Sequence, residues 1–438
     1  MKRILILLYC VCPLLLYGQN VLFTLEDMHT VVKGETWESI ASQQGITVME
    51  LKAANPDVKK KKLKKGTLLI LPQRQEPVPV AEVPEKPVPV IRTAYSNVRV
   101  GVLLPLADRR MVEFYRGLLM AADSVRKSGV NLDIHAWDCG TTIAQIEALL
   151  PKLKELDVLF GPASATQIPP VAEVCKEQGI RLVLPFFSGQ ILQDYPLVYN
   201  VTAPSTLLYV AAMNKLRSFY PDRNYVVVRT GNTDNKGKNL VETVTQSLAQ
   251  QASAPRTLEL EGDDFAYESA FNQFRDNMIV LDDSNIRSLN ILLSHIKDFR
   301  LKHPQYRLSV LGFDSWLDET ATLLDDFFTL DTYIISPYYY NVLDDRIKAF
   351  ERNYTKNFRA SVSMKNPRFA ALGFDLGQYF LQGISSLGDT FEQMQGSIHQ
   401  KPYQNFFSFE RNASAVSFVN NFVQFIHYTP ENKIEIIR

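Results

Sequence analysis

The chain has 438 residues, and its 47 Lys and Arg residues equal its 47 Asp and Glu residues in number. This length predicts two or three domains, and the neutral balance excludes a broad basic surface for nucleic acid. The hydrophobic content of 46% is typical of a globular protein, and beyond the leader no apolar run reaches the ~18 residues of a membrane-spanning helix.

The N-terminal residues have the pattern of an export signal. Two basic residues precede an apolar stretch at 4–17, and the small Gly18 follows it. This pattern predicts a secretory signal peptide over residues 1–19. The alternative is a lipoprotein signal at Cys10 or Cys12, but bulky residues stand before both cysteines where small ones are usual. Export places the protein in the periplasm or the cell envelope.

Two cysteines remain once the leader is removed, Cys139 and Cys175. An oxidising compartment permits a disulfide between them. The sequence does not say whether their Cα atoms lie within the ~4.4–6.8 Å that a disulfide needs. Two buried free thiols are the favoured interpretation.

The stretch after the leader predicts a small module with two strands and two helices. A β run, a helix cap, a glycine turn, a T-x-x-E capping box and a closing apolar run follow one another. In chain order these are Val31 with Val32, Thr36, Gly45, Thr47 with Glu50, and residues 68–71. The unit spans residues 29–72, near the lower size limit for folding without disulfides.

This stretch resembles a LysM module. The matching positions are Thr30, Val31, Gly34, Glu35, Thr36, Ser39, Ile40, Ala41, Gly45, Val48, Leu51, Asn55, Pro56, Leu63, Gly66, Ile70 and Pro72. The sequence departs from the family at His29, where Tyr is usual, and at Trp37, where an aliphatic residue is usual. The resemblance implies a βααβ fold that binds glycans containing N-acetylglucosamine, chiefly peptidoglycan.

The resemblance also implies a glycan site on the loop after the first strand and the loop after the second helix. Here it comprises Gly34, Glu35, Thr36, Trp37, Ile46, Asn55, Pro56 and Asp57. Backbone amides in these tight turns would bind sugar hydroxyls and acetamides. The alternative is a spacer with no affinity for glycan. The KKKKLKK run at 59–65 is either a solvated loop face or a salt-sensitive contact for peptidoglycan carboxylates.

Residues 73–97 predict a linker, because five prolines fall between positions 77 and 89. Chain of this composition favours polyproline II at ~3.1 Å per residue and acts as a semi-rigid spacer. It separates the module from the rest of the protein.

From residue 98 onward, short apolar runs alternate with amphipathic helices. The runs are VRVGVLL, DIHAW, DVLFG, RLVLPFF, YVVVRTG, LSVLGF and TYIISP. One helix presents Phe114, Leu118, Ala121, Ala122 and Val125 on a single face, and the next presents Ile143, Ile146, Leu149, Leu150 and Leu153. Runs without polar alternation are typical of parallel strands buried on both faces. The pattern predicts an α/β fold with doubly wound parallel sheets, whose ligands gather at the carboxyl ends of the strands.

This part resembles the type I periplasmic solute-binding proteins, specifically the leucine/amide-binding branch of ABC importers. The matching segments are VRVGVLLPL, DVLFGPASATQIPPVAEVCKEQGIRLVLPF and LGFDLGQYFLQGI. The resemblance covers residues 98–438 and implies two lobes that close on a small ligand. The expected lobes are about 98–202 with 338–395, and 203–337 with 396–438.

The resemblance implies a ligand cleft formed by turns after the strands. Its expected residues are Ser164, Ala165, Thr166, Ser188 and Gly189 for a carboxylate, and Asp314 or Asp138 for an ammonium group. Phe186 and Phe187 stand where the family has small residues. These rings are expected to shrink the cleft or to favour an apolar ligand.

The sequence contains no GxxxxGK[ST], HExxH, GxSxG or CxxC pattern, and its six histidines show no metal-ligand spacing. We therefore predict no enzyme, no metal and no cofactor. The favoured function is a peptidoglycan-anchored envelope protein whose solute-binding-like domain binds a small ligand or a protein partner, in the manner of envelope regulators of cell-wall synthesis that share this fold. The alternative is the binding component of an amino-acid-type ABC importer, which wall attachment would hinder.

Overall fold

The structure is a computed structural model that describes residues 28–56, 58, 63–71, 94–189, 192, 194–411 and 416–438. The predicted signal peptide, residues 73–93 of the predicted linker, Asp57 and the lysines at 59–62 lie outside these residues. The chain divides into two compact units, Met1–Pro89 and Val90–Arg438.

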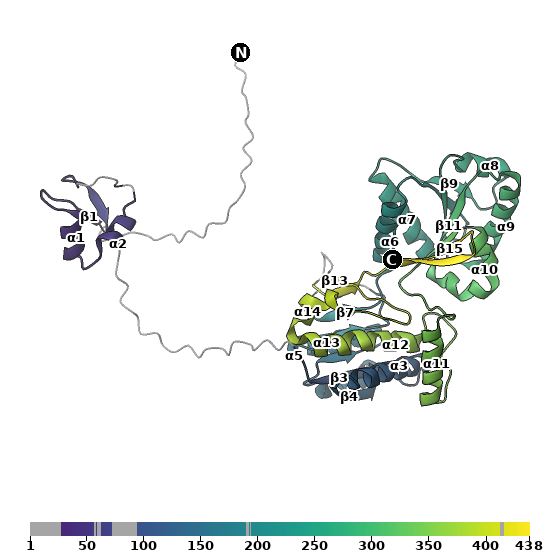
Figure 1. Ribbon diagram of the computed structural model, residues 1–438, viewed down its shortest axis with the longest axis horizontal. Helices are drawn as coiled ribbons and strands as arrows, with labels where there is room; N and C mark the ends of the chain where they lie inside the picture. Colours follow the sequence, from purple (N-terminus) through teal and green to yellow (C-terminus); the bar gives the residue numbers. More distant parts are fainter. Residues whose placement is uncertain are drawn as a thin grey trace, which may run out of the picture. The chain divides into compact units, whose positions relative to one another are not determined.

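The first unit contains the predicted βααβ module (Figure 1). Its elements are β1 (Met28–Thr30), α1 (Trp37–Gln43), α2 (Val48–Ala53) and β2 (Leu68–Ile70), with β1 and β2 antiparallel. The first strand ends before Val31, although the Val31 backbone still pairs with Thr67 and Gly66. The core consists of Val31, Trp37, Ile40, Ala41, Leu51 and Leu69.

Both predicted helix caps are confirmed. Thr36 accepts a hydrogen bond from the Ser39 backbone N–H, and the Ser39 hydroxyl accepts one from the Thr36 N–H. Thr47 and Glu50 form the same reciprocal pair at α2. These caps satisfy backbone donors that a short helix would otherwise leave unpaired. Gly45 has a φ of +68°, the left-handed conformation expected after α1.

The larger unit contains two lobes, each with a seven-stranded sheet covered by helices (Figure 1). In the first sheet the order is β13 (Phe409–Arg411), β14 (Phe418–Asn420), β7 (Val198–Asn200), β6 (Arg181–Leu184), β5 (Val158–Phe160), β3 (Asn97–Leu104), β4 (Asn131–Asp138). In the second it is β16 (Lys433–Ile437), β15 (Gln424–Thr429), β12 (Thr332–Ser336), β11 (Leu308–Phe313), β10 (Asn277–Leu281), β8 (Asn224–Arg229), β9 (Arg256–Glu259). The strands are parallel apart from the antiparallel pairings of β13 with β14, β12 with β15 and β15 with β16.

Helices cover these sheets. The first lobe has α3 (Arg109–Arg126), α4 (Ile143–Glu147), α5 (Ile168–Gln178), α11 (Asp345–Phe358), α12 (Phe369–Gly377), α13 (Gly383–Leu387) and α14 (Phe391–Met394), and a π-helical segment (Gln378–Gln382) joins α12 to α13. The second lobe has α6 (Ser205–Phe219), α7 (Asn235–Ala249), α8 (Asp264–Ala270), α9 (Ile286–Lys302) and α10 (Thr320–Thr329). Short 3-10 helices lie at Leu150–Lys152, Ala165–Gln167, Asp314–Glu319, Gly388–Thr390 and Gln395–Ser397.

The predicted α/β fold with two sheets is confirmed, and the helix α3 buries the predicted apolar face. The second predicted helix is shorter than expected. It ends at Glu147, a 3-10 turn that contains Pro151 follows, and Ile143 is about half exposed. Proline removes a backbone donor and blocks continuation of an α-helix.

The lobe boundary near residue 396 requires correction. Strands β13 and β14 join the first sheet, whereas β15 and β16 join the second. The chain therefore crosses between the lobes at residues 201–204, 337–344 and 421–423. The last crossing lies later than expected because β14 pairs in parallel with β7.

The first lobe depends on a close approach of α3 and α12. A Cβ atom added to Gly117 would lie 1.9 Å from the Ala370 carbonyl oxygen, and one added to Gly373 would lie 2.0 Å from that of Phe114. The two helix backbones therefore touch at these glycines. This contact fixes α12, which carries residues of both cavities described below.

Candidate functional site

The loop after β1 in the small module is held by one carboxylate. Glu35 accepts hydrogen bonds from the Val32 backbone N–H at 2.8 Å and from the His29 ring at 2.9 Å. These contacts, that of His29 above all, hold the pKa of Glu35 below its usual value. Gly34, with a φ of +101°, and Thr36 are exposed beside it. The loop is thus fixed in shape and open to solvent.

Trp37 and Asn55, two of the predicted glycan contacts, are structural. Trp37 is 3% exposed in the module core. The Asn55 amide donates to the carbonyls of Leu51 and Ile70, each at 2.8 Å, and its oxygen accepts from the Ile70 N–H at 2.7 Å. Pro56 is exposed, Ile46 is half-buried, and Asp57 lies outside the described residues.

Substitution of Asn55 by Ala is expected to destabilise the small module by about 2–3 kcal/mol, because buried backbone groups of Leu51 and Ile70 lose their partner. A module of this size has only a few kcal/mol of stability. Limited proteolysis followed by mass spectrometry should show faster cleavage within residues 28–71. The exposed Met49→Gln is the matched control and should cleave at the wild-type rate; equal rates for both variants would contradict the role of Asn55.

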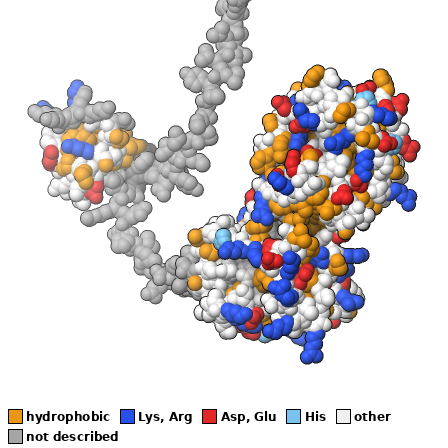
Figure 2. All heavy atoms as spheres, turned by 45° about the vertical axis from the view of Figure 1, so that its right-hand side comes forward, with side chains coloured by type: hydrophobic (Ala, Val, Ile, Leu, Met, Phe, Trp, Pro, Cys, Tyr) orange, Lys and Arg blue, Asp and Glu red, His pale blue; other side chains and the backbone are white. Residues whose placement is uncertain are grey.

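A cavity of about 470 Å³ lies between the two lobes of the larger unit. Its lining residues come from strand ends, from the interlobe crossings and from α3 and α12: Pro105, Asp108, Arg110, Met111, Ala163, Pro185, Phe186, Val201, Thr202, Asp314, Pro337, Tyr338, Pro367, Phe369, Leu372 and Asn405. Hydrophobic side chains gather where the lobes meet in Figure 2. We refer to this cavity as the interlobe cavity.

Aromatic rings form one wall of the interlobe cavity. Phe186 stacks on Phe369 with ring centroids 5.6 Å apart and meets the edge of Phe114 at 5.0 Å. Prolines at 105, 185, 337 and 367 extend this apolar surface. The ring of Phe186 therefore lies in the cleft, as expected from its departure from the family pattern.

The charged groups of the interlobe cavity are paired with one another or with near neighbours. Arg110 donates to the Asp108 carboxylate at 2.7 Å, and Asp314 accepts from the Lys236 ammonium at 2.7 Å. Burial, together with the Asp314 carboxylate, raises the pKa of Tyr338. A zwitterionic amino acid would have to compete with these pairs for a carboxylate or ammonium partner.

Asp314 is the one predicted cleft residue that lines the interlobe cavity. The others do not line it: Ser164, Ala165, Thr166, Ser188 and Gly189. The hydroxyls of Ser164 and Thr166 are 3.0 Å apart and bond to each other, and Pro169 and Pro170 remove donors from the start of α5. The Asp138 carboxylate binds the backbone N–H groups of Leu106 and Gly140 and so stabilises a turn.

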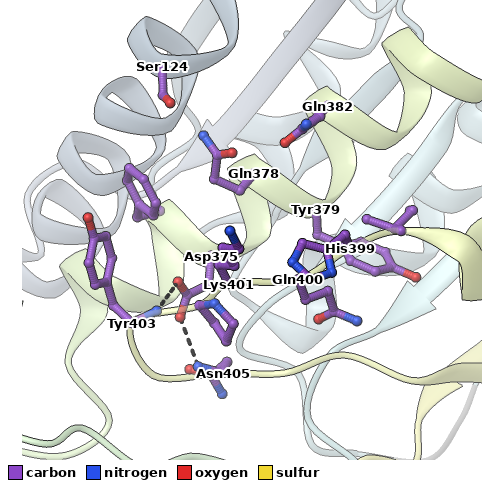
Figure 3. Close-up of a pocket in the computed structure, with 13 residues that line it drawn as sticks. Ser124, Asp375, Gln378, Tyr379, Gln382, His399, Gln400, Lys401, Tyr403 and Asn405 are labelled. Carbon is purple, nitrogen blue, oxygen red and sulfur yellow. Dashed lines mark hydrogen bonds between the residues drawn. The ribbon is translucent and has the colours of Figure 1, made fainter. Parts of the chain in front are cut away.

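A second cavity, of about 380 Å³, lies on the first lobe. Its residues come from α3, from α12 with the π-helical segment, and from the segment 398–405; they are Ser124, Phe374, Asp375, Gln378, Tyr379, Gln382, Ile398, His399, Gln400, Lys401, Pro402, Tyr403 and Asn405. In Figure 3, Ser124, Gln378 and Gln382 line one side and His399, Gln400 and Lys401 the other. We refer to it as the flank cavity. The sequence did not predict this cavity, because two glutamines four positions apart, such as Gln378 and Gln382, are common on helix surfaces and do not by themselves indicate a site.

The carboxylate of Asp375 lies at the base of the flank cavity. It accepts hydrogen bonds from the backbone N–H groups of Tyr403 at 2.8 Å and Asn405 at 2.8 Å (Figure 3). A third comes from the backbone N–H of Gln404 at 2.9 Å. The side chain is buried, and this burial raises its pKa to about 7 in spite of the three donors. The positive charge of Arg346 lowers the pKa of Asp375, but this effect is smaller than that of burial.

The raised pKa of Asp375 predicts a pH-dependent stability. In an unfolded chain an Asp has a pKa of about 3.9, so between about pH 4 and pH 7 the folded protein binds the proton more tightly. Stability is then lost as the pH rises through this range, by at most about 1.4 kcal/mol per pH unit. Urea unfolding at pH 5, 6, 7 and 8 should show this slope in the wild-type protein and a flatter one in Asp375→Asn; parallel slopes would contradict it.

The two cysteines of the larger unit lie in its interior. Cys139 and Cys175 are buried free thiols, and burial raises their pKa values to about 11 and about 12. Thiols in this state are weak nucleophiles. The described residues contain no group of three or more His, Cys, Asp or Glu placed to hold a metal ion. Among the same residues, no helix has the length and apolar character to cross a membrane.

Comparison with known proteins agrees with this architecture. The larger unit has the type I periplasmic-binding fold. A putative branched-chain amino acid ABC transporter from Rhodospirillum rubrum superposes with a TM-score of 0.55 at 12% identity, covering 78% of this chain and all of that one. Full-length LpoA from Haemophilus influenzae superposes with a TM-score of 0.51 at 12% identity, covering 78% of this chain and 59% of that one.

The small module is a LysM domain, and the LysM family model matches residues 29–72. No match was found among curated protein sequences. LysM domains and periplasmic-binding folds are both binding domains rather than catalytic ones, and both are typical of exported envelope proteins. The protein therefore combines a LysM domain, a type of domain that binds peptidoglycan, with a bilobed domain of the type I periplasmic-binding fold.

Proposed function

We propose that the protein is a non-catalytic component of the cell envelope. Its signal peptide directs export, its LysM domain binds peptidoglycan, and its bilobed domain binds an apolar group of a small ligand or a protein partner in the interlobe cavity. The observation that carries this proposal is the pairing of charges in that cavity, where Asp108 holds Arg110 and Lys236 holds Asp314.

Wall binding is supported by the LysM domain itself. The loop that contains Gly34 and Thr36 is open to solvent and fixed by Glu35. One shallow site of this kind gives weak binding, and the proline-rich segment at 73–97 connects this domain to the bilobed domain. Anchoring then raises the local concentration of that domain at the wall.

Co-sedimentation with purified peptidoglycan tests the anchor. The full chain should pellet with the wall, and Asn55→Ala, which is expected to destabilise the LysM domain, should pellet to a smaller extent. Met49→Gln should pellet like the wild-type protein. If Asn55→Ala still pellets fully, the anchor lies elsewhere and the proposal fails.

The alternative is an amino-acid-binding component of an ABC importer, which the fold shared with the R. rubrum protein favours. A thermal-shift screen of the full chain with the twenty amino acids separates the two functions. The paired charges and the wall of Phe186 and Phe369 lead us to expect no shift with any of them. A shift of several degrees with one amino acid would establish the carrier function instead.

A further inference from the structure

Several polar side chains of the flank cavity have no partner among the described residues, whereas the charged side chains of the interlobe cavity are paired. Ser124, Gln382, His399 and Lys401 line it, and among the described residues none of their side chains has a hydrogen-bond or ion-pair partner. The Asp375 carboxylate is buried behind them and saturated by three backbone donors. The accessible lining is therefore rich in donors and carries its formal positive charge on Lys401.

We propose that the flank cavity is a second ligand site, for a hydroxylated carboxylate of the sugar-acid class. The hydroxyl of Ser124 and the amide of Gln382 both donate and accept, as sugar hydroxyls require, and the Lys401 ammonium pairs with the carboxylate. Tyr403 and Phe374 are half-buried and offer apolar surface to a sugar ring. A volume of about 380 Å³ accommodates one pyranose with its substituents.

A ligand in the flank cavity acts on the interlobe cavity through the segment 403–405. Asn405 lines both cavities. The Gln404 carbonyl accepts the N–H of Tyr339 at 3.0 Å, and Asn405 forms an antiparallel bridge with Tyr338. Tyr338 and Tyr339 belong to the interlobe crossing at 337–344, and Tyr338 lines the interlobe cavity. One short segment thus joins the floor of one site to a wall of the other.

The methionines of the chain provide a local reporter for each site. Met120 packs in the cluster that contains Phe374 and Tyr403, beside the flank cavity. Met111 lines the interlobe cavity, and Met49 is 80% exposed on the LysM domain. Methyl NMR of the full chain labelled with [13C-methyl]methionine therefore distinguishes the three places in one titration.

Three probes are used: N-acetylmuramic acid, N-acetylglucosamine and lactate. N-acetylglucosamine has the same ring as N-acetylmuramic acid but lacks the lactyl carboxylate. We expect N-acetylmuramic acid to shift the Met120 methyl saturably, with Met111 following at the same apparent Kd. N-acetylglucosamine should shift Met49 and bind the flank cavity at least about tenfold more weakly, since a charge-assisted hydrogen bond is lost. Lactate alone should leave Met120 unmoved; an equal shift with lactate would make the site a general anion site and overturn the sugar-acid assignment.

Variants Lys401→Gln and Gln382→Leu should each weaken the Met120 response by about tenfold while leaving the thermal stability unchanged, because both side chains are exposed. The control is the Lys433→Gln variant, which changes an exposed lysine of the second lobe and should respond as the wild-type protein does.

The site is refuted if the Met120 methyl does not shift, or if its shift is unaffected by Lys401→Gln. A shifted Met120 with an unmoved Met111 refutes the coupling. The proposed wall anchoring is judged separately, from Met49 and from co-sedimentation.

Discussion

Substitution of Gly117 by Ala is expected to lower the free energy of unfolding of the larger unit by about 3 kcal/mol, the upper part of the range for overpacking. The added methyl carbon would lie 1.9 Å from the carbonyl oxygen of Ala370. The obstacle is backbone, so no side-chain rotation relieves it and α3 must move away from α12. Urea denaturation followed by circular dichroism measures the effect.

The control for this experiment is Gly396→Ala. No atom lies within 4 Å of a Cβ built on Gly396, and its φ is not in the left-handed region. Its free energy of unfolding should stay within about 0.5 kcal/mol of the wild-type value. A Gly117→Ala protein as stable as this control would show that the two helices do not touch at residue 117.

The second large effect is expected at the buried ion pair between β6 and α14. Arg181 donates to the two carboxylate oxygens of Glu392 at 2.7 and 3.0 Å, and the Tyr199 hydroxyl donates to Glu392 at 3.0 Å. Glu392→Gln leaves the buried guanidinium without a counter-charge. We expect a loss of about 3 kcal/mol in the free energy of unfolding.

Two further proteins make the ion-pair experiment specific. The double variant Arg181→Met with Glu392→Met removes both charges and should recover much of the lost stability, because neither partner remains unpaired. Asp123→Asn breaks the exposed pair with Lys127 and should cost less than about 0.5 kcal/mol. Equal losses of unfolding free energy for Glu392→Gln and Asp123→Asn would mean that the buried pair stabilises the fold no more than the exposed pair does.

Local signals in the sequence were sufficient for the LysM domain. The caps at Thr36 and Thr47 depend on residues three positions away, so they follow from the sequence alone. The position of β1 does not follow from the local sequence. It is set by pairing with β2, in which Met28 faces Ile70 across the sheet, and no local pattern contains that partner.

In the larger unit, the sequence predicted the strands with long apolar runs and missed others. The strand β10 lies between β11 and β8 in the second sheet, and periodicity alone cannot separate its short apolar run from a buried helix segment. The strands β13 to β16 were also missed. All four take part in antiparallel pairs, and β13 and β16 are edge strands, where solvent exposure adds polar residues to the pattern.

The cavities were harder to predict than the fold. Asp314 was identified because it follows a buried strand directly. Asp108 and Arg110 were overlooked, because they lie at the start of α3 and do not directly follow the last residue of β3. Phe369 and Asn405 do not directly follow a strand in the sequence, and their places in the interlobe cavity depend on α12 and on the crossings between lobes.

The order of the strands has a consequence for how the protein is made. Residues 409–437 supply β13 and β14 to the first sheet and β15 and β16 to the second. A nascent chain that stops before this segment exposes the open edge of β7 in one lobe and of β12 in the other, and unpaired edges invite aggregation. The sheets of both lobes are therefore completed only when this last segment of the chain has been made.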